Sequence, residues 1–199
     1  MLQSPYKEKP IEQWEEITTQ LVNDHPLKTD EIVDIVLSSW NGIFMSDIGA
    51  GKYKIGKDIF PKPQIMGFLL NEFIALELSK RYPGKWRGDI TANEKDLVYL
   101  PDNYYSIEIK TSSNDKHIYG NRSYAQKSSR SKKSKSGYYL AINFQKFESG
   151  AKKLPQITLV RFGWLDHEDW IGQNAATGQQ ARLNPEIEQK KLLVIYQGE

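Results

Sequence analysis

The sequence predicts a fold that contains both helices and β-strands, on the basis of two observations. Three segments before residue 83 have the apolar spacing of three to four residues that is typical of amphipathic helices. Five later segments are short and rich in β-branched and aromatic residues, which favours strands. The chain has 199 residues, of which 39% are hydrophobic, so it is long enough to bury a core. We therefore expect one domain over residues 1–199.

The three predicted helices differ in how much of their surface is apolar. Ile11–Val22 is amphipathic and has acids in its first turn, where the helix dipole favours negative charge. The second helix begins near Thr29, which is a suitable cap. Its buried stripe is predicted to be Ile32, Ile35, Val36 and Trp40. Gly67–Tyr82 is apolar almost all round, so we expect this helix to be largely buried.

Glu72 is an acid among the apolar residues of the Gly67–Tyr82 helix. A carboxylate on an apolar face is costly unless it is paired or bound to a metal ion. Glu72 is therefore either a functional residue or a glutamate at the rim of the apolar stripe, and the sequence leaves both interpretations open.

The strands are predicted over five segments. Asp96–Leu100 and Tyr104–Thr111 are expected to form a hairpin, closed by a three-residue loop at 101–103 that contains proline and asparagine. The other three strands are Tyr138–Phe147, Ile157–Trp164 and Leu192–Tyr196.

The predicted hairpin brings two carboxylates together. If Leu100 and Tyr104 close the loop, Asp96 lies opposite Glu108, with their Cβ atoms roughly 5 Å apart. Alternation along the strand places Glu108 and Lys110 on the same face. Like charges directly opposite are destabilising, and a divalent cation removes that penalty. Because Mg²⁺ prefers one or two carboxylates together with water and phosphate oxygens, we predict a Mg²⁺ site here, with the Lys110 ammonium beside it.

Asp96 followed by Glu108-Ile109-Lys110 resembles the catalytic signature of the PD-(D/E)XK nuclease superfamily. Lys95 stands where that signature usually has proline. The segments EKDLV, SIEIKTSS, YGNRSYAQ and KKSKSGYYLAINF resemble type II restriction endonucleases of the ScaI kind. This second resemblance covers about Pro61 to Trp170.

The resemblance implies an α/β (α+β) fold with a central mixed sheet of about five strands flanked by helices. The helical part and a basic, glycine-rich loop would occupy residues 1–60, and the catalytic core residues 61–199. The implied activity is Mg²⁺-dependent, site-specific cleavage of double-stranded DNA by a homodimer on a palindromic site. The implied catalytic residues are Asp96, Glu108, Lys110 and Glu72, and the implied metal ligands are Asp96, Glu108 and the Ile109 carbonyl.

Two other functions fit the same residues. A structure-specific repair or junction nuclease would share the core and require flaps or junctions in its substrate. A DNA-binding module without catalysis would bind DNA whether or not Mg²⁺ is present.

A basic segment, Asn121–Ser136, lies between the second and third predicted strands and contains no acid. Its cations are Arg122, Lys127, Arg130, Lys132, Lys133 and Lys135. Because lysine, arginine and serine are usual contacts of the DNA backbone, we predict that these cations bind phosphates, together with Ser112 and Ser113. The alternative is a solvated loop, which is common for charge runs.

Composition and motifs exclude several classes of protein. The chain has no cysteine, which excludes disulfides, cysteine-based zinc sites and thiol nucleophiles. The net charge of +2 is too small to indicate a nucleic-acid partner by itself. No apolar run reaches the roughly 18 residues of a membrane span, and the N-terminus lacks an apolar signal core. We therefore expect a cytoplasmic, prokaryotic intracellular protein with no membrane partner.

Two further motifs do not match known sites. Gly49–Lys52 has the letters GAGK, but the spacing and the following residue do not fit a phosphate-binding loop. That loop either contacts DNA or is an ordinary surface loop. Asp166–Asp169 contains acids and a histidine without the spacing of a zinc site, so we predict a turn.

Overall fold

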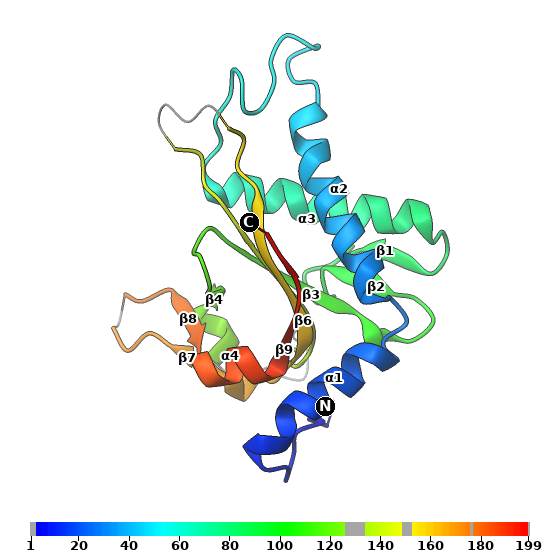
Figure 1. Cartoon of the computed structure of the whole chain (residues 1–199), viewed down its shortest axis with the longest axis vertical. Coiled ribbons are helices and arrows are strands. Elements are labelled where there is room, and N and C mark those ends of the chain that lie inside the picture. Colours follow the sequence, from blue (N-terminus) through cyan, green and yellow to red (C-terminus); the bar gives the residue numbers. More distant parts are fainter. Residues whose placement is uncertain (1–2, 126–133, 149–152, 176, 199) are drawn as a thin grey trace.

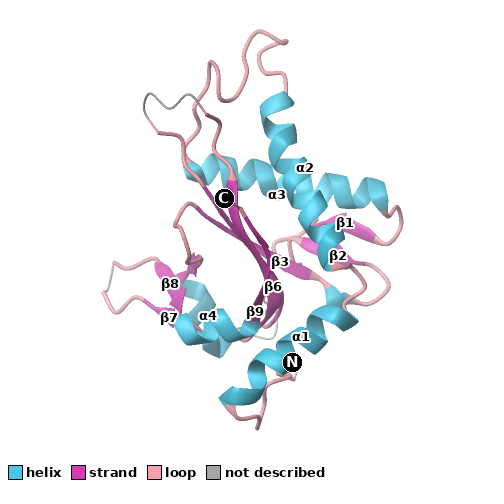
Figure 2. Cartoon of the chain, in the orientation of Figure 1, coloured by secondary structure: helices cyan, strands magenta, loops and turns pink. Residues whose placement is uncertain are grey.

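The computed structural model describes residues 3–125, 134–148, 153–175 and 177–198. A mixed six-stranded sheet crosses the molecule in the order β1-β2-β3-β5-β6-β9 (Figure 1; Figure 2). Its strands are β1 (Trp86–Gly88), β2 (Leu97–Tyr99), β3 (Ile107–Ser112), β5 (Gly137–Phe144), β6 (Ile157–Leu165) and β9 (Leu192–Gln197). Only β3 and β5 run parallel; the other neighbours are antiparallel. The predicted mixed sheet is confirmed, and all five predicted strands belong to it.

Four short strands were not predicted. One is β1, at an edge of the main sheet. The others, β4 (Tyr119–Asn121), β7 (Trp170–Gly172) and β8 (Gln180–Leu183), form a separate antiparallel sheet in the order β4-β8-β7. Each strand has three or four residues, which is too short for an alternating pattern to stand out.

The helices are α1 (Trp14–Asp24, after a 3₁₀ turn at Ile11–Gln13), α2 (Thr29–Met45), α3 (Pro63–Arg81) and α4 (Pro185–Lys191). Lys28 rather than Thr29 is at the N-cap of α2. The predicted stripe of α2 is buried. The short α4, capped by the Asn184 side chain, was not predicted. In the described part of the chain, no helix is long and apolar enough to cross a membrane.

Two hydrophobic cores lie on opposite faces of the sheet. The strand β5 shows this most clearly, because Leu140 and Ile142 belong to the larger core with α1, α2 and α3, whereas Tyr139 and Ala141 belong to the smaller core. The smaller core also includes Ile118, just before β4, and residues of β7 and β8. A strand that is buried on both faces reads as a continuous apolar run, as β5 does in the sequence.

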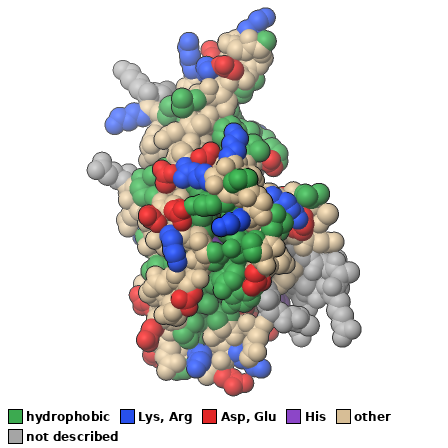
Figure 3. All heavy atoms as spheres, turned by 90° about the vertical axis from the view of Figure 1, so that its right-hand side faces the viewer, with side chains coloured by type: hydrophobic (Ala, Val, Ile, Leu, Met, Phe, Trp, Pro, Cys, Tyr) green, Lys and Arg blue, Asp and Glu red, His purple; other side chains and the backbone are tan. Residues whose placement is uncertain are grey.

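The expectation that α3 is largely buried is wrong. Its inward side is buried, but Ile65, Phe68 and Leu76 on the opposite side are 52%, 61% and 56% exposed. One side of α3 packs on α2 and on β1 and β3, and the described residues leave its outer side uncovered. On the face drawn in Figure 3, hydrophobic side chains likewise reach the surface among interspersed acidic and basic ones.

His25 is a neutral histidine of the larger core. It is fully buried between aromatic rings, including those of Tyr138 and Phe162. Its Nδ1 accepts a hydrogen bond from Leu27 N at 3.1 Å, and its Nε2 lies 3.1 Å from the Tyr105 carbonyl oxygen. A neutral ring protonated at Nε2 satisfies both contacts. Burial lowers the pKa of His25 to about 4.

Stability should therefore fall as the pH falls from 6.5 to 4. The folded-state pKa is depressed below the unfolded value, so the unfolded chain binds an extra proton in this window, and the contribution is fully present above pH 6.5. The difference between the ordinary pKa of 6.5 and the folded-state pKa of about 4 corresponds to about 3 kcal/mol in the free energy of unfolding. Urea denaturation at a series of pH values measures it. His25→Gln should show a correspondingly flatter pH dependence; equal slopes in the two proteins would contradict the prediction.

Candidate active site

The hairpin register predicted from the sequence is confirmed. Leu97 pairs with Ile107, and in this antiparallel register Asp96 falls opposite Glu108. The predicted three-residue loop is wrong, because the connection continues through a 3₁₀ turn at Asn103–Tyr105. The Asp102 side chain accepts a hydrogen bond from Tyr104 N at 2.9 Å, which fixes the start of that turn.

Asp96 is held by the backbone of the neighbouring strand. Its Oδ2 accepts a hydrogen bond from Ile109 N at 2.7 Å, and the residue is half-buried. Asp96 and the Ile109 peptide therefore have a fixed relative position before any ligand binds.

Glu108 is more deeply buried than expected, at 2% exposure. A carboxylate that binds a metal ion and its water is predicted to face solvent, but Glu108 lies on the face of β3 that adjoins the smaller core. Its Oε1 accepts hydrogen bonds from Lys110 Nζ at 2.8 Å and from the Tyr124 hydroxyl. Lys95 Nζ lies 3.9 Å from Oε2. A buried carboxylate needs such partners, and here two lysines offset its charge.

Lys110 contacts two of the oxygens that we predicted to bind a metal ion. Its Nζ donates to Glu108 Oε1 and, at 3.0 Å, to the Ile109 carbonyl oxygen. The ammonium also lies 4.6 Å from the centre of the Tyr124 ring. The predicted position of Lys110 on the same face as Glu108 is confirmed.

The donor set suits a hard divalent cation. The oxygens are the carboxylates of Asp96 and Glu108 and the carbonyl of Ile109, and Mg²⁺ takes few protein oxygens of this kind and completes its shell with water. Among the described residues there is no group of three or more histidine or acidic side chains that could hold a metal ion. The two carboxylates with one carbonyl are therefore the arrangement to consider.

Of the two interpretations of Glu72 that the sequence left open, its position fits the glutamate at the rim of the apolar stripe. It is exposed, on the outer side of α3 between Phe68 and Leu76, because the helix turns its other side to the sheet. The interpretation as a residue at the edge of the apolar stripe fits this position better than a buried carboxylate does. In the described residues it forms no metal-binding group with Asp96 and Glu108, and its catalytic role stays a prediction.

Two site residues were not predicted, namely Lys95 and Tyr124. The sequence pattern identified Lys95 only as a departure from the usual proline. Tyr124 is in a 3₁₀ turn, Arg122–Ala125, and is 6% exposed. Burial raises the pKa of Tyr124 above its usual value, so the phenol keeps the proton that it donates to Glu108. The sequence contained one signal for each of these two residues: Lys95 is next to Asp96, and Tyr124 is the second tyrosine of YGNRSYAQ.

Part of the basic segment is described. Arg122 Nη1 donates to the carbonyl oxygens of Ala175 and Gly178, at 3.2 and 3.3 Å, and so holds the connection between β7 and β8. Lys135 Nζ lies 4.1 Å from the centre of the Tyr124 ring. The predicted phosphate contacts Lys127, Arg130, Lys132 and Lys133 lie outside the described residues.

Buried polar groups anchor the chain that follows β3. Ser112 Oγ accepts a hydrogen bond from Asn114 N at 3.1 Å, and Ser113 is half-buried beside it. Asn143 Nδ2 donates to the Asn114 carbonyl oxygen at 2.7 Å. Arg161 Nη2 donates to the Lys116 carbonyl oxygen, also at 2.7 Å. The segment next to the predicted catalytic strand is thus tied to β5 and β6.

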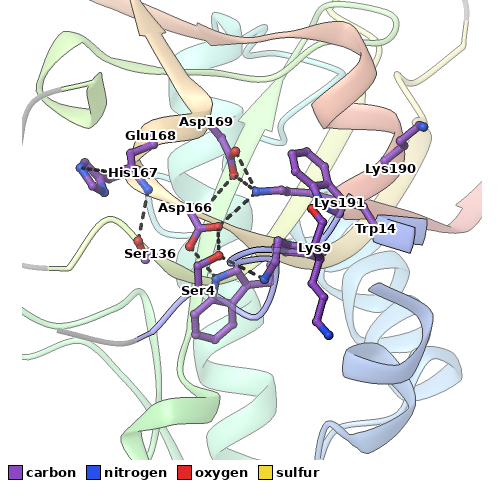
Figure 4. Close-up of polar contacts among 12 residues, drawn as sticks. Ser4, Lys9, Trp14, Ser136, Asp166, His167, Glu168, Asp169, Lys190 and Lys191 are labelled. Atoms are coloured by element: carbon purple, nitrogen blue, oxygen red, sulfur yellow. Dashed lines mark hydrogen bonds and ion pairs between the residues drawn. The ribbon is translucent and has the colours of Figure 1, made fainter. Parts of the chain in front are cut away.

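The predicted turn at Asp166–Asp169 is confirmed. It follows β6 as a 3₁₀ turn over His167–Asp169. Asp166 and Asp169 point toward Lys191, whose Nζ lies 3.1 Å from Asp166 Oδ2 and 2.8 Å from Asp169 Oδ1 (Figure 4). The acids of this motif therefore pair with a lysine of α4.

Comparison with known proteins finds a matching family and a similar protein. A family model described as ScaI restriction endonuclease matches residues 4–196. The type II restriction enzyme ScaI of Streptomyces caespitosus is 48% identical over 196 residues, which cover 98% of this chain and 86% of that protein. No solved structure matches the chain. A family match over nearly the whole length, with a relative of this identity, shows that the chain belongs to the ScaI restriction endonuclease family.

Proposed function

We propose that the hairpin from Asp96 to Lys110 is the catalytic centre at which this protein cuts double-stranded DNA with Mg²⁺. Family membership makes the chain a type II restriction endonuclease that cleaves DNA, and the proposal concerns its metal ion, residues and assembly. One observation carries it. The Lys110 ammonium contacts both Glu108 Oε1 and the Ile109 carbonyl oxygen, while Asp96 accepts from the amide of Ile109.

The residues divide into ligands and a cation. Asp96, Glu108 and the Ile109 carbonyl would hold Mg²⁺. When bound, the ion supplies Lewis acidity and lowers the pKa of a water molecule. The Lys110 ammonium then either holds the attacking water or offsets negative charge on the phosphate, and Asp96 and the Ile109 peptide keep their relative position through their hydrogen bond.

Lys110 competes with a cation for the same oxygens, which gives a test. Lys110→Met should abolish cleavage and at the same time tighten Mn²⁺ binding by about tenfold, which corresponds to about 1.4 kcal/mol. The tightening follows because the like-charged ammonium no longer contacts Glu108 and Ile109. Titration calorimetry with Mn²⁺ in the absence of DNA measures the affinity. Lys116→Met, at an exposed lysine after β3, is the control and should change neither property. Weaker binding in Lys110→Met would contradict the competition.

The DNA partner implies a dimer and a contact surface. A palindromic duplex has two-fold symmetry, and two copies of one active site fit it best as a homodimer. The lysines and arginines between Arg122 and Lys135 would contact the phosphate backbone. Of these cations, Lys135 is described beside Tyr124 at the site. Such an enzyme works in the cytoplasm of a prokaryotic cell, where its substrate is.

Plasmid digestion tests the proposed function. With Mg²⁺, supercoiled plasmid should give discrete fragments with one end sequence; with EDTA it should stay intact. Cleavage limited to flaps or junctions would indicate the structure-specific alternative, and DNA binding without any cutting would indicate a module without catalysis. The family match supports site-specific cleavage over both.

A further inference from the structure

One side chain contacts both the predicted metal ligand and the predicted catalytic lysine. The Tyr124 hydroxyl donates to Glu108 Oε1, the same oxygen that accepts from Lys110 Nζ at 2.8 Å. The ring of Tyr124 faces the Lys110 ammonium, with its centre 4.6 Å from Nζ. The hydroxyl therefore fixes the carboxylate, and the ring keeps the ammonium close to it.

Tyr124 is itself held firmly. Its ring packs against Trp170 of β7, with the ring centres 5.2 Å apart. Gly120 of β4 leaves room for it, since a Cβ atom at Gly120 would lie 3.1 Å from Tyr124 Cγ. The backbone N of Arg122, in the same turn, donates to the Gln179 carbonyl oxygen at 2.7 Å. The small sheet thus positions the hydroxyl that contacts the main sheet.

Tyr124 belongs both to the candidate active site and to the basic segment. Tyr124 lies just before residues 126–133, and Lys135, just after them, places its ammonium 4.1 Å from the centre of the same ring. Tyr124 and Lys135, two described residues of the basic segment on either side of residues 126–133, thus contact each other.

We propose that Tyr124 is a positioning residue, which orients Glu108 for metal binding and keeps Lys110 beside it. This rests on the proposed function, in which Glu108 is a metal ligand. Hydrogen-bond partners of metal-ligating carboxylates orient the ligand, and their loss typically lowers metal affinity or activity by about 10- to 100-fold.

Tyr124→Phe is the test, because it removes the hydroxyl and keeps the ring that faces Lys110, Lys135 and Trp170. We expect the Kd for Mn²⁺, measured by calorimetry without DNA, to rise about 10-fold or more. The Mg²⁺ concentration for half-maximal cleavage should rise in parallel, and high Mg²⁺ should restore much of the maximal rate, because Asp96, Glu108 and Lys110 are all present.

Tyr139→Phe is the matched control. Tyr139 is paired with Glu108 across β3 and β5 and is equally buried, but its hydroxyl donates to the Lys135 carbonyl oxygen at 2.6 Å. Its Mn²⁺ affinity should stay within about twofold of wild type, whatever the two variants lose in thermal stability. Wild-type affinity in Tyr124→Phe, or an equal loss in both variants, would overturn the proposal.

The same titrations separate this proposal from the proposed function. If the wild-type protein binds no Mn²⁺, or if Asp96→Asn binds it as tightly as wild type, the metal site itself is misassigned and both proposals fail. If Asp96→Asn loses the ion and Tyr124→Phe does not, only the role of Tyr124 is wrong.

Discussion

Asp96→Asn should reduce DNA cleavage by at least about 10³-fold and leave the fold intact. The loss corresponds to about 4 kcal/mol of transition-state stabilisation, the range expected when a metal ligand is removed. The fold should survive because the asparagine Oδ1 can still accept the hydrogen bond from Ile109 N that Asp96 Oδ2 accepts at 2.7 Å. Single-turnover cleavage of a plasmid, together with thermal melting, measures both quantities.

Asp102→Asn provides the control within the same hairpin. Asp102 is exposed, and its Oδ1 accepts from Tyr104 N at 2.9 Å, so the same substitution keeps the same kind of acceptor. Its cleavage rate should be close to that of wild type. If Asp96→Asn cuts DNA as fast as Asp102→Asn, Asp96 is not a metal ligand and the motif is misassigned.

Glu108→Ala is a less informative test of the active site than Asp96→Asn. From the sequence alone, Glu108→Ala is expected to abolish cleavage without disturbing the fold, since the carboxylate is placed in water. The structure buries it between Lys110, Lys95 and Tyr124. Removing one partner of a buried charged group leaves the others uncompensated, so inactivity of Glu108→Ala would mix chemistry with stability.

The sequence predicted the main sheet because its strands carry strong local signals. Alternation in β3 separates Ile107 and Ile109 from Glu108 and Lys110, and in the structure the two pairs lie on opposite faces of the sheet. The small sheet depends on contacts between segments distant in sequence, such as Gly120 with Ala181. Pairings of this kind have no local periodicity, and a single sequence does not display them.

The residues of the candidate site also differ in how far the sequence alone could predict them. Asp96, Glu108 and Lys110 were identifiable because one hairpin brings them together, and its register follows from the strand pattern. Tyr124 reaches Glu108 from a turn that the small sheet holds in place, so its role depends on tertiary structure. The sequence identified Lys95 only as an absent proline, although its ammonium lies 3.9 Å from Glu108 Oε2.

Lys191→Met should lower the free energy of unfolding by about 3–5 kcal/mol, the usual cost of removing one partner from a buried ion pair. Lys191 is 3% exposed and pairs with both Asp166 and Asp169, whose charges would remain buried without it (Figure 4). Its ammonium also lies 4.3 Å from the centre of the Tyr6 ring, so the N-terminal segment should loosen too.

Lys190→Met is the control for this loss, because it removes the adjacent lysine. Lys190 pairs at 3.5 Å with Glu186, whose side chain is 56% exposed, and exposed pairs of this kind contribute about 0–1 kcal/mol. Urea denaturation at pH 7 compares the two variants with wild type. A loss in Lys191→Met no larger than that in Lys190→Met would mean that water or rearranged side chains compensate Asp166 and Asp169, and that α4 does not depend on this pairing for its attachment to the turn after β6.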